Sequence, residues 1–258
     1  MAITVTGLGV TPVKGTRLRA VDRLRLDRYG ARENRRFFLI DDRDQMVNAT
    51  RLGRLNSVLS DYDDEQRRLA LRFPDGRVLE DEVRLGDEVT ARFYAEPMRA
   101  TLVGGGWSEA ISEFVGQPVR LVEAGDAGAV DRGLTGAITL ISRASVERLA
   151  ERADRPSVDP RRFRMLIEVD GVDAHEEDGW VGRRLEVGET VLRGRGHVGR
   201  CVITNRHPET GEIDLQTLEI LGRFRRDVDT TEPVALGIYG EVVQPGAVSV
   251  GDVVQIDA

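Results

Sequence analysis

The residue with the most distinctive chemistry in this sequence is its single cysteine. Cys201 follows Arg200 in a stretch that is typical of a strand running into a polar turn. A cationic neighbour favours the thiolate, which is the form that ligates soft metals or acts as a nucleophile. A cysteine in a strand is also often a small apolar core residue. The residue alone therefore leaves a reactive thiolate and a structural cysteine both open.

The single lysine is the second candidate. Lys14 precedes Gly15 at the end of an apolar strand pattern, whereas every other basic residue is an arginine. A lysine beside a glycine turn offers a point charge and exposed N–H groups, which together bind anions. The alternative is a solvated surface lysine. The excess of arginine itself is typical of a GC-rich genome.

Two groups of arginines precede apolar strand patterns. Arg35 and Arg36 lead into Phe37–Ile40, and a second group of arginines at 161, 162 and 164 leads into 165–169. A guanidinium at a strand end can bind a phosphate through two parallel hydrogen bonds. An ordinary surface ion pair with one of the 44 acidic residues is the alternative for each of them.

Composition excludes several classes of function. One cysteine cannot form a disulfide within the chain, a cysteine-rich zinc site or an iron–sulfur cluster. A net charge of −7 argues against nucleic acid and anionic membranes as partners. We find no apolar run of membrane-spanning length and no signal-peptide pattern, so we expect a cytoplasmic protein.

The elements that position these residues are mainly strands. Short β-branched runs punctuated by 28 glycines predict β-barrels, and a Pro-Asp-Gly turn at 74–76 predicts a hairpin. Three helices are expected, at 109–115, 146–153 and 215–224, with caps at Ser108, Ser145 and Asp214. We expect a mostly β fold with two domains, 1–97 and 98–258.

Several motifs together resemble a known family. Residues 200–211, Arg-Cys-Val-Ile-Thr-Asn-Arg-His-Pro-Glu-Thr-Gly, are similar to the Arg-Cys-x-x-Thr-Thr-x-x-Pro-x-Thr-Gly pattern of the MOSC domain. Weaker matches to the MOSC domain and its N-terminal β-barrel domain lie at 11–15, 34–37, 140–145, 220–225, 237–239 and 245–252. In layout the chain resembles the amidoxime-reducing components.

The resemblance implies two β-barrel domains with a cleft between them that holds a molybdenum cofactor, Mo-molybdopterin. Cys201 would be the catalytic residue and the metal ligand. The cofactor-binding residues that the resemblance implies are Lys14, Gly15, Arg35, Ser142, Arg164, Gly199, Arg200 and Tyr239.

The sequence departs from the family pattern at three positions in these motifs and at one in a further match, Phe163-Arg164-Met165-Leu166 for the family's Phe-Arg-Pro-Asn. The family has asparagine where this chain has Leu166, serine at Gly15, aspartate at His207 and a second threonine at Asn205. We expect the loss of the asparagine and the aspartate to affect substrate binding and proton delivery. We expect binding of the cofactor phosphate to be less affected.

The resemblance implies an enzyme, a molybdenum-dependent oxidoreductase that reduces small N-hydroxylated compounds. One cysteine leaves no second redox module, so electrons would come from a separate ferredoxin- or flavin-type reductase. One alternative is a carrier of the cofactor, or of sulfur as a persulfide on Cys201, without redox turnover. Another is a binding module that has kept the fold without the cofactor.

Overall fold

The protein is described by a computed structural model that covers residues 2–93, 96–125 and 133–257. Its largest sheet closes into a barrel of seven strands, because β14 pairs with β13 on one side and with β1 on the other. An eighth strand, β2, extends β1 outside the barrel. In order, these strands are β14 (Ile167–Asp170), β13 (Ile138–Ser142), β17 (Ala235–Gln244), β16 (Thr190–Gly199), β15 (Arg184–Val187), β19 (Val253–Ile256), β1 (Ile3–Val10) and β2 (Arg19–Val21). Buried aliphatic side chains such as Val10, Ile167, Leu192 and Ile238 fill its core.

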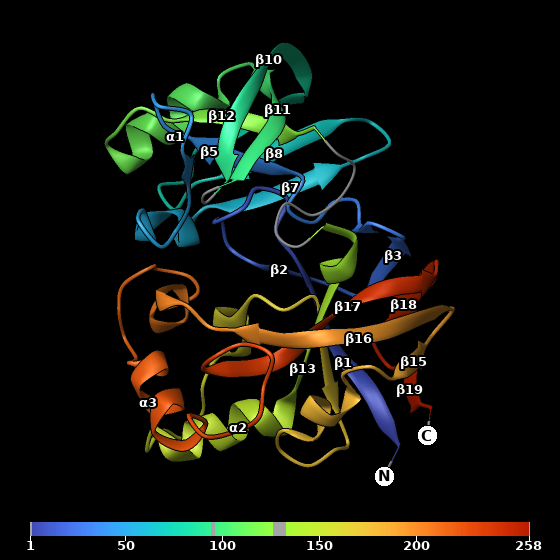
Figure 1. The fold of residues 1–258 in the computed structure, drawn as a ribbon. Coiled ribbons are helices and arrows are strands. Elements are labelled where there is room, and N and C mark those ends of the chain that lie inside the picture. Colours follow the sequence, from blue (N-terminus) through green and yellow to red (C-terminus); the bar gives the residue numbers. More distant parts are fainter. Residues whose placement is uncertain (1, 94–95, 126–132, 258) are drawn as a thin grey trace.

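A second body lies above the barrel in the view of Figure 1. It contains a five-stranded sheet and a three-stranded sheet, packed around Phe37, Leu71, Trp107 and Leu121. The five strands in order are β10 (Arg84–Phe93), β11 (Glu96–Gly104), β12 (Arg120–Ala124), β5 (Phe37–Ile40) and β6 (Met46–Val47). The three strands are β7 (Leu59–Asp63), β8 (Arg68–Arg72) and β9 (Val78–Glu82). The predicted mostly β fold is confirmed.

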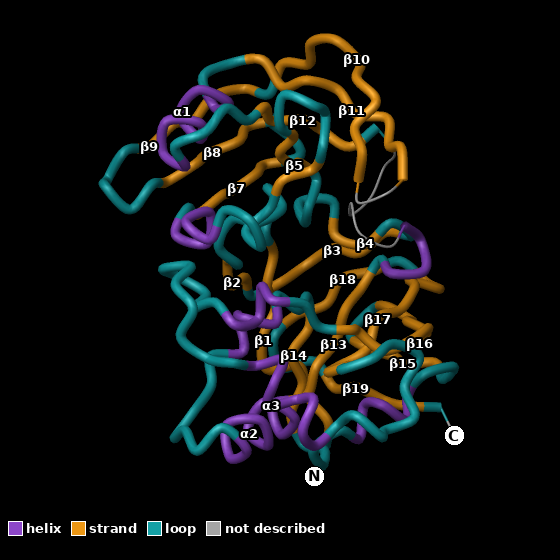
Figure 2. The backbone as a smooth tube through the Cα atoms, turned by 60° about the vertical axis from the view of Figure 1, so that its left-hand side comes forward, coloured by secondary structure: helices purple, strands orange, loops and turns teal. Residues whose placement is uncertain are grey.

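The predicted hairpin is formed by β8 and β9, with Gly76 at a φ of +90° in the turn. A further small sheet joins the two ends of the chain, since β18 (Gly246–Ser249) pairs with β3 (Arg23–Asp27), which also pairs with β4 (Gly30–Ala31). Figure 2 shows this sheet beside the barrel strands.

The three predicted helices exist, but each prediction of the N-terminal cap was wrong. Helix α1 (Trp107–Val115) follows Gly106, and α3 (Thr217–Phe224) follows Gln216. Helix α2 (Arg143–Arg152) is capped by Ser142, whose side chain accepts the N–H of Ser145. Asp214 binds Arg162 instead of capping α3, with oxygen–nitrogen distances of 3.0 and 3.2 Å.

Short 3-10 helices connect many of the strands. They are η1 (Gly53–Ser57), η2 (Gly133–Gly136), η3 (Pro160–Phe163), η4 (Glu176–Trp180) and η5 (Val202–Asn205). In the part of the chain that the structure describes, no helix has the length and apolarity needed to span a bilayer.

The division predicted after residue 97 does not follow the pairing of the strands. β10 and β11 pair across that position, and β12 continues the same sheet as far as Ala124. Part of the predicted first domain also belongs to the barrel, because β1, near the start of the chain, is one of the barrel strands. We therefore propose that the second body ends after β12 and that the barrel includes β1 together with the later part of the chain.

Candidate functional site

A pocket of about 350 Å³ is lined by residues from both bodies. Its walls come from the turn after β1, Arg35 just before β5, the turn after β6, η2 with the start of β13, η3 with the residues after it, and the end of β16 with η5. Seven of the nine predicted site residues line it: Lys14, Gly15, Arg35, Arg164, Gly199, Arg200 and Cys201. Segments far apart in the sequence thus place the predicted basic residues around the single thiol.

The described lining of the pocket is rich in basic residues. Four of its lining residues are cationic: Lys14, Arg35, Arg164 and Arg200. Among the lining residues that the structure describes there is no aspartate, glutamate or histidine. Desolvated cations that face a cavity raise the local concentration of anions and bind them through charge-assisted hydrogen bonds. The pocket is therefore suited to an anionic ligand.

Two of these arginines have an uncommon backbone conformation. Arg35 and Arg164 have φ values of +52° and +56°, in the left-handed region that costs a residue with a side chain roughly 1–2 kcal/mol. Hydrogen bonds hold them there, from the Arg35 N–H to the Thr11 carbonyl at 2.8 Å and from the Arg164 N–H to the Arg161 carbonyl at 3.1 Å. Strain of this kind concentrates at binding and catalytic sites.

Glycine is required at position 15. Gly15 has a φ of +99°, and a Cβ there would lie 3.1 Å from the backbone nitrogen of Ala49. The family's serine at this position would thus be strained here. The Lys14 N–H donates to the Phe37 carbonyl at 2.8 Å, and its ammonium group lies 5.4 Å from the centre of the Phe93 ring.

Hydrogen bonds between the arginines and main-chain carbonyls join the walls of the pocket. Arg35 Nη2 donates to the Arg164 carbonyl at 3.0 Å. Arg164 Nη2 donates to the Thr16 carbonyl at 2.6 Å, beside the turn that carries Lys14. Each of these guanidiniums therefore both lines the pocket and fixes a neighbouring segment of its wall.

Arg200 braces the segment that leads to the thiol. It donates to the carbonyls of Phe163 (3.0 Å) and Leu236, and to the Met165 sulfur at 3.1 Å. Its guanidinium carbon lies 5.3 Å from the centre of the Phe163 ring. These bonds connect the end of β16 to η3 and β17, so Arg200 positions both the thiol and the segment that precedes Arg164.

Cys201 is exposed and lies at the start of η5, where its carbonyl accepts the N–H of Thr204 at 3.1 Å. Two residues earlier, the Gly199 N–H donates to Glu232 Oε2 at 3.1 Å, and a Cβ on Gly199 would lie 2.3 Å from that oxygen. Within the described ranges, no group of three or more His, Cys, Asp or Glu side chains could hold a metal ion. The protein donor that the pocket offers a soft metal is the thiol of Cys201.

Ser142 and Tyr239 do not line the pocket. Ser142 is fully buried, and its Oγ bonds Glu177 Oε2 at 2.9 Å and Ser145 Oγ at 2.8 Å. Tyr239 covers Gly196, where a Cβ would lie 2.6 Å from the tyrosine oxygen. Both side chains are thus used in packing β13 and β17 against neighbouring elements.

The positions that depart from the family pattern have structural roles. Leu166 is buried in the barrel core. Asn205 Oδ1 accepts the N–H of Leu218 at 3.2 Å, which fixes the start of α3. His207 Nδ1 accepts the N–H groups of Glu209 and Thr210, at 3.2 and 3.3 Å.

Sequence reasoning missed the part of the pocket formed by the turn after β6. Asn48, Ala49 and Thr50 line it, and Asn48 Oδ1 caps this turn through the N–H of Thr50 at 2.8 Å. Arg162 was considered with its neighbours as a phosphate-binding arginine, but it does not line the pocket: it is buried and donates to the carbonyl of Thr204 at 2.9 Å. The sequence Asn-Ala-Thr at 48–50 could have indicated this turn. The burial of Arg162, in contrast, depends on contacts with residues that are distant in the sequence.

Outside the pocket, His175 is a half-buried histidine whose two ring nitrogens have no hydrogen-bond partner. Burial, followed by the positive charge of Arg225, lowers its pKa from 6.5 to about 4. The unfolded chain therefore binds a proton more readily than the folded protein between these two values.

We expect this histidine to make the protein less stable in mild acid. The contribution of the neutral His175 to the free energy of unfolding is fully present above about pH 6.5. It decreases as the pH drops towards 4, by roughly 1–3 kcal/mol in total. His175→Asn removes the titration and tolerates the φ of +70° at this position. Urea unfolding between pH 7 and pH 4.5 tests this. Parallel losses in both proteins would exclude His175 as the cause.

Models of two protein families match the chain. The MOSC domain matches residues 127–255, and the MOSC N-terminal beta barrel domain matches residues 2–118. The chain is 36% identical over 121 residues to mitochondrial amidoxime-reducing component 1 of Xenopus laevis, which covers 45% of this chain and 34% of that protein. It is 35% identical over 122 residues to mitochondrial amidoxime reducing component 2 of Rattus norvegicus, which covers 45% and 35%.

A molybdenum cofactor sulfurase of Oryza sativa subsp. japonica is 29% identical over 101 residues, which is 35% of this chain and 12% of that protein. The matched region thus spans about a third or less of the length of these relatives. Among solved structures, the YUAD protein from Bacillus subtilis aligns with 99% of this chain and 96% of its own, at 13% identity and a TM-score of 0.47. A likeness at this TM-score does not establish a shared fold.

From the two family models, the chain belongs to the MOSC-domain family, with a MOSC N-terminal β-barrel domain before the MOSC domain.

Proposed function

We propose that this protein binds a molybdenum–pterin cofactor in the pocket and reduces small N-hydroxylated compounds with electrons from a separate protein. The observation that carries the proposal is the pocket itself, in which one exposed thiol lies among four cationic side chains. The names of the relatives, two amidoxime-reducing components and a molybdenum cofactor sulfurase, support it.

The residues present fit this cofactor by the chemistry of their donors. A thiolate is a soft ligand of the kind that binds metals such as molybdenum, and the cationic groups suit a phosphate. Two lining residues, Arg35 and Arg164, also have the strained backbone that concentrates at binding sites, which supports this assignment. These groups support a cofactor with a metal at one end and a phosphate at the other.

Each predicted residue receives a role. Cys201 Sγ holds the metal. Lys14, Arg35 and Arg164 bind the phosphate and pterin, while the backbone of Gly15 and Gly199 lines the site. Arg200 positions the thiol through its bonds to main-chain carbonyls. Ser142 and Tyr239 brace the barrel behind the site, because their side chains do not line the pocket.

When bound, the metal supplies the two-electron chemistry, which the protein side chains lack. Reduction of an N-hydroxyl group takes two electrons and two protons and yields an N–H group and water. Cys201 is exposed, so solvent can supply the protons at this side of the pocket. The electrons come from a partner such as a ferredoxin- or flavin-type reductase.

The assay that tests this function uses benzamidoxime and an artificial one-electron donor with protein purified from a host that makes the cofactor. We expect benzamidine to form. We expect no activity from protein that has been prepared without molybdenum. If protein that carries one molybdenum per chain shows no turnover, the proposed reductase activity is wrong.

An exposed thiol also supports a second candidate, transfer of sulfur as a persulfide on Cys201. Mass spectrometry of the intact protein after incubation with a cysteine desulfurase and cysteine tests this candidate. One added sulfur atom that is released by a thiol acceptor would support it. An unmodified thiol in the presence of an active desulfurase would exclude it.

We expect Lys14→Ala to lower retention of the pterin by roughly tenfold or more, because a charge-assisted bond to phosphate contributes about 1.5–3 kcal/mol. Lys14→Arg keeps the charge and restores part of the retention. Arg223→Ala, which removes one exposed cation from α3, is the matched control. Pterin fluorescence after denaturation is the measurement, and equal pterin content in the Lys14→Ala protein would contradict the role of this lysine.

A further inference from the structure

The loop 206–212 connects the two walls of the pocket. Arg206 Nη2 donates to the carbonyl of Thr50 on one wall at 3.2 Å, and the Arg206 N–H donates to the carbonyl of Ile203 on the other at 3.1 Å. Thr50 and Ile203 both line the pocket. A shift of this loop therefore changes the distance between the two walls.

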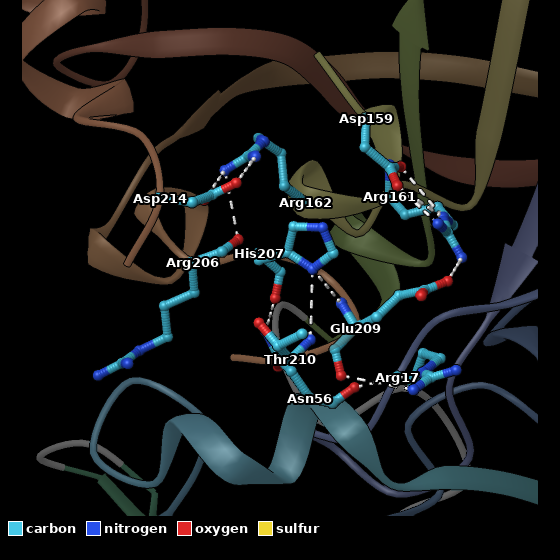
Figure 3. Close-up of polar contacts among 10 residues, drawn as sticks. All are labelled: Arg17, Asn56, Asp159, Arg161, Arg162, Arg206, His207, Glu209, Thr210 and Asp214. Carbon is cyan, nitrogen blue, oxygen red and sulfur yellow. Dashed lines mark hydrogen bonds and ion pairs between the residues drawn. The ribbon is translucent and has the colours of Figure 1, made fainter. Parts of the chain in front are cut away.

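Further contacts tie the same loop to η1 of the second body and to the segment between β1 and β2, as Figure 3 shows. Asn56 Nδ2 donates to the carbonyl of His207 at 3.4 Å, and Arg17 Nη2 donates to that of Glu209, also at 3.4 Å. Backbone packing is close as well, since a Cβ on Gly211 would lie 1.8 Å from the carbonyl oxygen of Gly53. The loop thus has little freedom to shift while its turn keeps its shape.

The shape of the turn depends on His207. Its Nδ1 accepts the N–H groups of Glu209 and Thr210, and the Gly211 N–H closes the turn on the carbonyl of His207 at 2.9 Å. A ring nitrogen that accepts hydrogen bonds carries no proton, so this geometry requires the neutral imidazole with its proton on Nε2. Aspartate, which the family has at this position, accepts the same bonds as a carboxylate and stays ionised above about pH 5.

Charged groups of both signs surround the imidazole. Glu209 is paired with Arg161 at 2.8 Å, which holds the pKa of this glutamate below its usual range. The charged groups that surround the loop are Arg17 from the segment between β1 and β2, Asp159, Arg161 and Arg162 from η3 and its cap, Arg206, Glu209 and Glu212 of the loop, and Asp214. Histidine is the residue type whose charge changes between about pH 5 and 8.

We propose that His207 is a positioning residue, which holds the loop 206–212 through its unprotonated Nδ1, and that protonation of the imidazole loosens the loop and weakens retention of the ligand in the pocket. Protonation turns the acceptor into a donor that faces two N–H groups, so both hydrogen bonds are lost. The part about retention rests on the proposed cofactor function, whereas the part about the loop does not.

The first test is made on the ligand-free protein by NMR. In the wild-type protein we expect the amides of Glu209 and Thr210 to lose protection from hydrogen exchange, corrected for intrinsic rates, by about tenfold between pH 8 and pH 5.5. In His207→Asn, whose Oδ1 accepts the same bonds and does not titrate, protection stays constant. Constant protection in both proteins, or an equal fall in both, would overturn the proposal.

The second test follows release of the pterin from the loaded protein at pH 8 and pH 5.5. We expect faster release at pH 5.5 in the wild type, by several-fold, and little change in His207→Asn. Equal acceleration in both proteins would overturn the link to the pocket. If the protein carries no pterin at all, the proposed function fails, and the exchange measurement still decides the role of His207.

Discussion

Cys201→Ala is expected to abolish reduction of N-hydroxylated compounds and to lower molybdenum retention by more than about 100-fold. Residues that only orient a metal ligand already contribute about 10–100-fold, so removal of the ligand itself costs more. The side chain is exposed, so the free energy of unfolding should change by no more than about 0.5 kcal/mol.

The measurement is the molybdenum content of the purified variant together with its activity. Val202→Ala is a matched control, since it shortens the next exposed side chain without removing a donor. We expect the control to keep its metal. Full metal content and turnover in Cys201→Ala would eliminate the thiol as the ligand.

Arg162→Met is expected to have the largest effect on stability, a loss of roughly 2–4 kcal/mol. Arg162 is 5% exposed and donates to the carbonyls of Thr204 and Arg206 and to both carboxylate oxygens of Asp214. Hydrogen bonds from a charged group contribute about 1.5–3 kcal/mol, and removal of one partner leaves the buried acceptors unsatisfied. Methionine fills a similar volume without replacing these bonds.

Urea unfolding at pH 7.5 measures this loss. Arg223→Met removes an arginine that pairs with Glu219 on the exposed face of α3, and it should change the stability by less than about 0.5 kcal/mol. The η5 segment beside Cys201 should also become more open to exchange, because Arg162 fixes its carbonyls. Equal stability of the two variants would contradict the organising role of Arg162.

The sequence predicted those parts of the site that local patterns encode. The motif around Cys201 and the turn at Lys14 and Gly15 were identified from their residues, and the structure brings both to one pocket. The hairpin of β8 and β9 followed from its Pro-Asp-Gly turn. Each of these features depends on residues close to one another in the chain.

Features that depend on distant contacts could not be predicted in this way. The strand at Ile3–Val10 belongs to the barrel because it pairs with β14, more than 150 residues later. Ser142 was expected in the pocket, yet its hydroxyl is held by Glu177, a residue buried 35 positions away. Asp214 looked like a helix cap because its partner Arg162 is far away in the sequence. The local sequence pattern contains no information about partners that are distant in the sequence.

The most direct test of the central claim is the molybdenum and pterin content of the protein purified from a host that makes the cofactor. Metal is measured by mass spectrometry and pterin by fluorescence after denaturation, with Cys201→Ala and Lys14→Ala in parallel. We predict close to one molybdenum and one pterin per wild-type chain, loss of metal in the first variant and loss of pterin in the second. A wild-type protein from such a host that carries neither metal nor pterin would contradict the account.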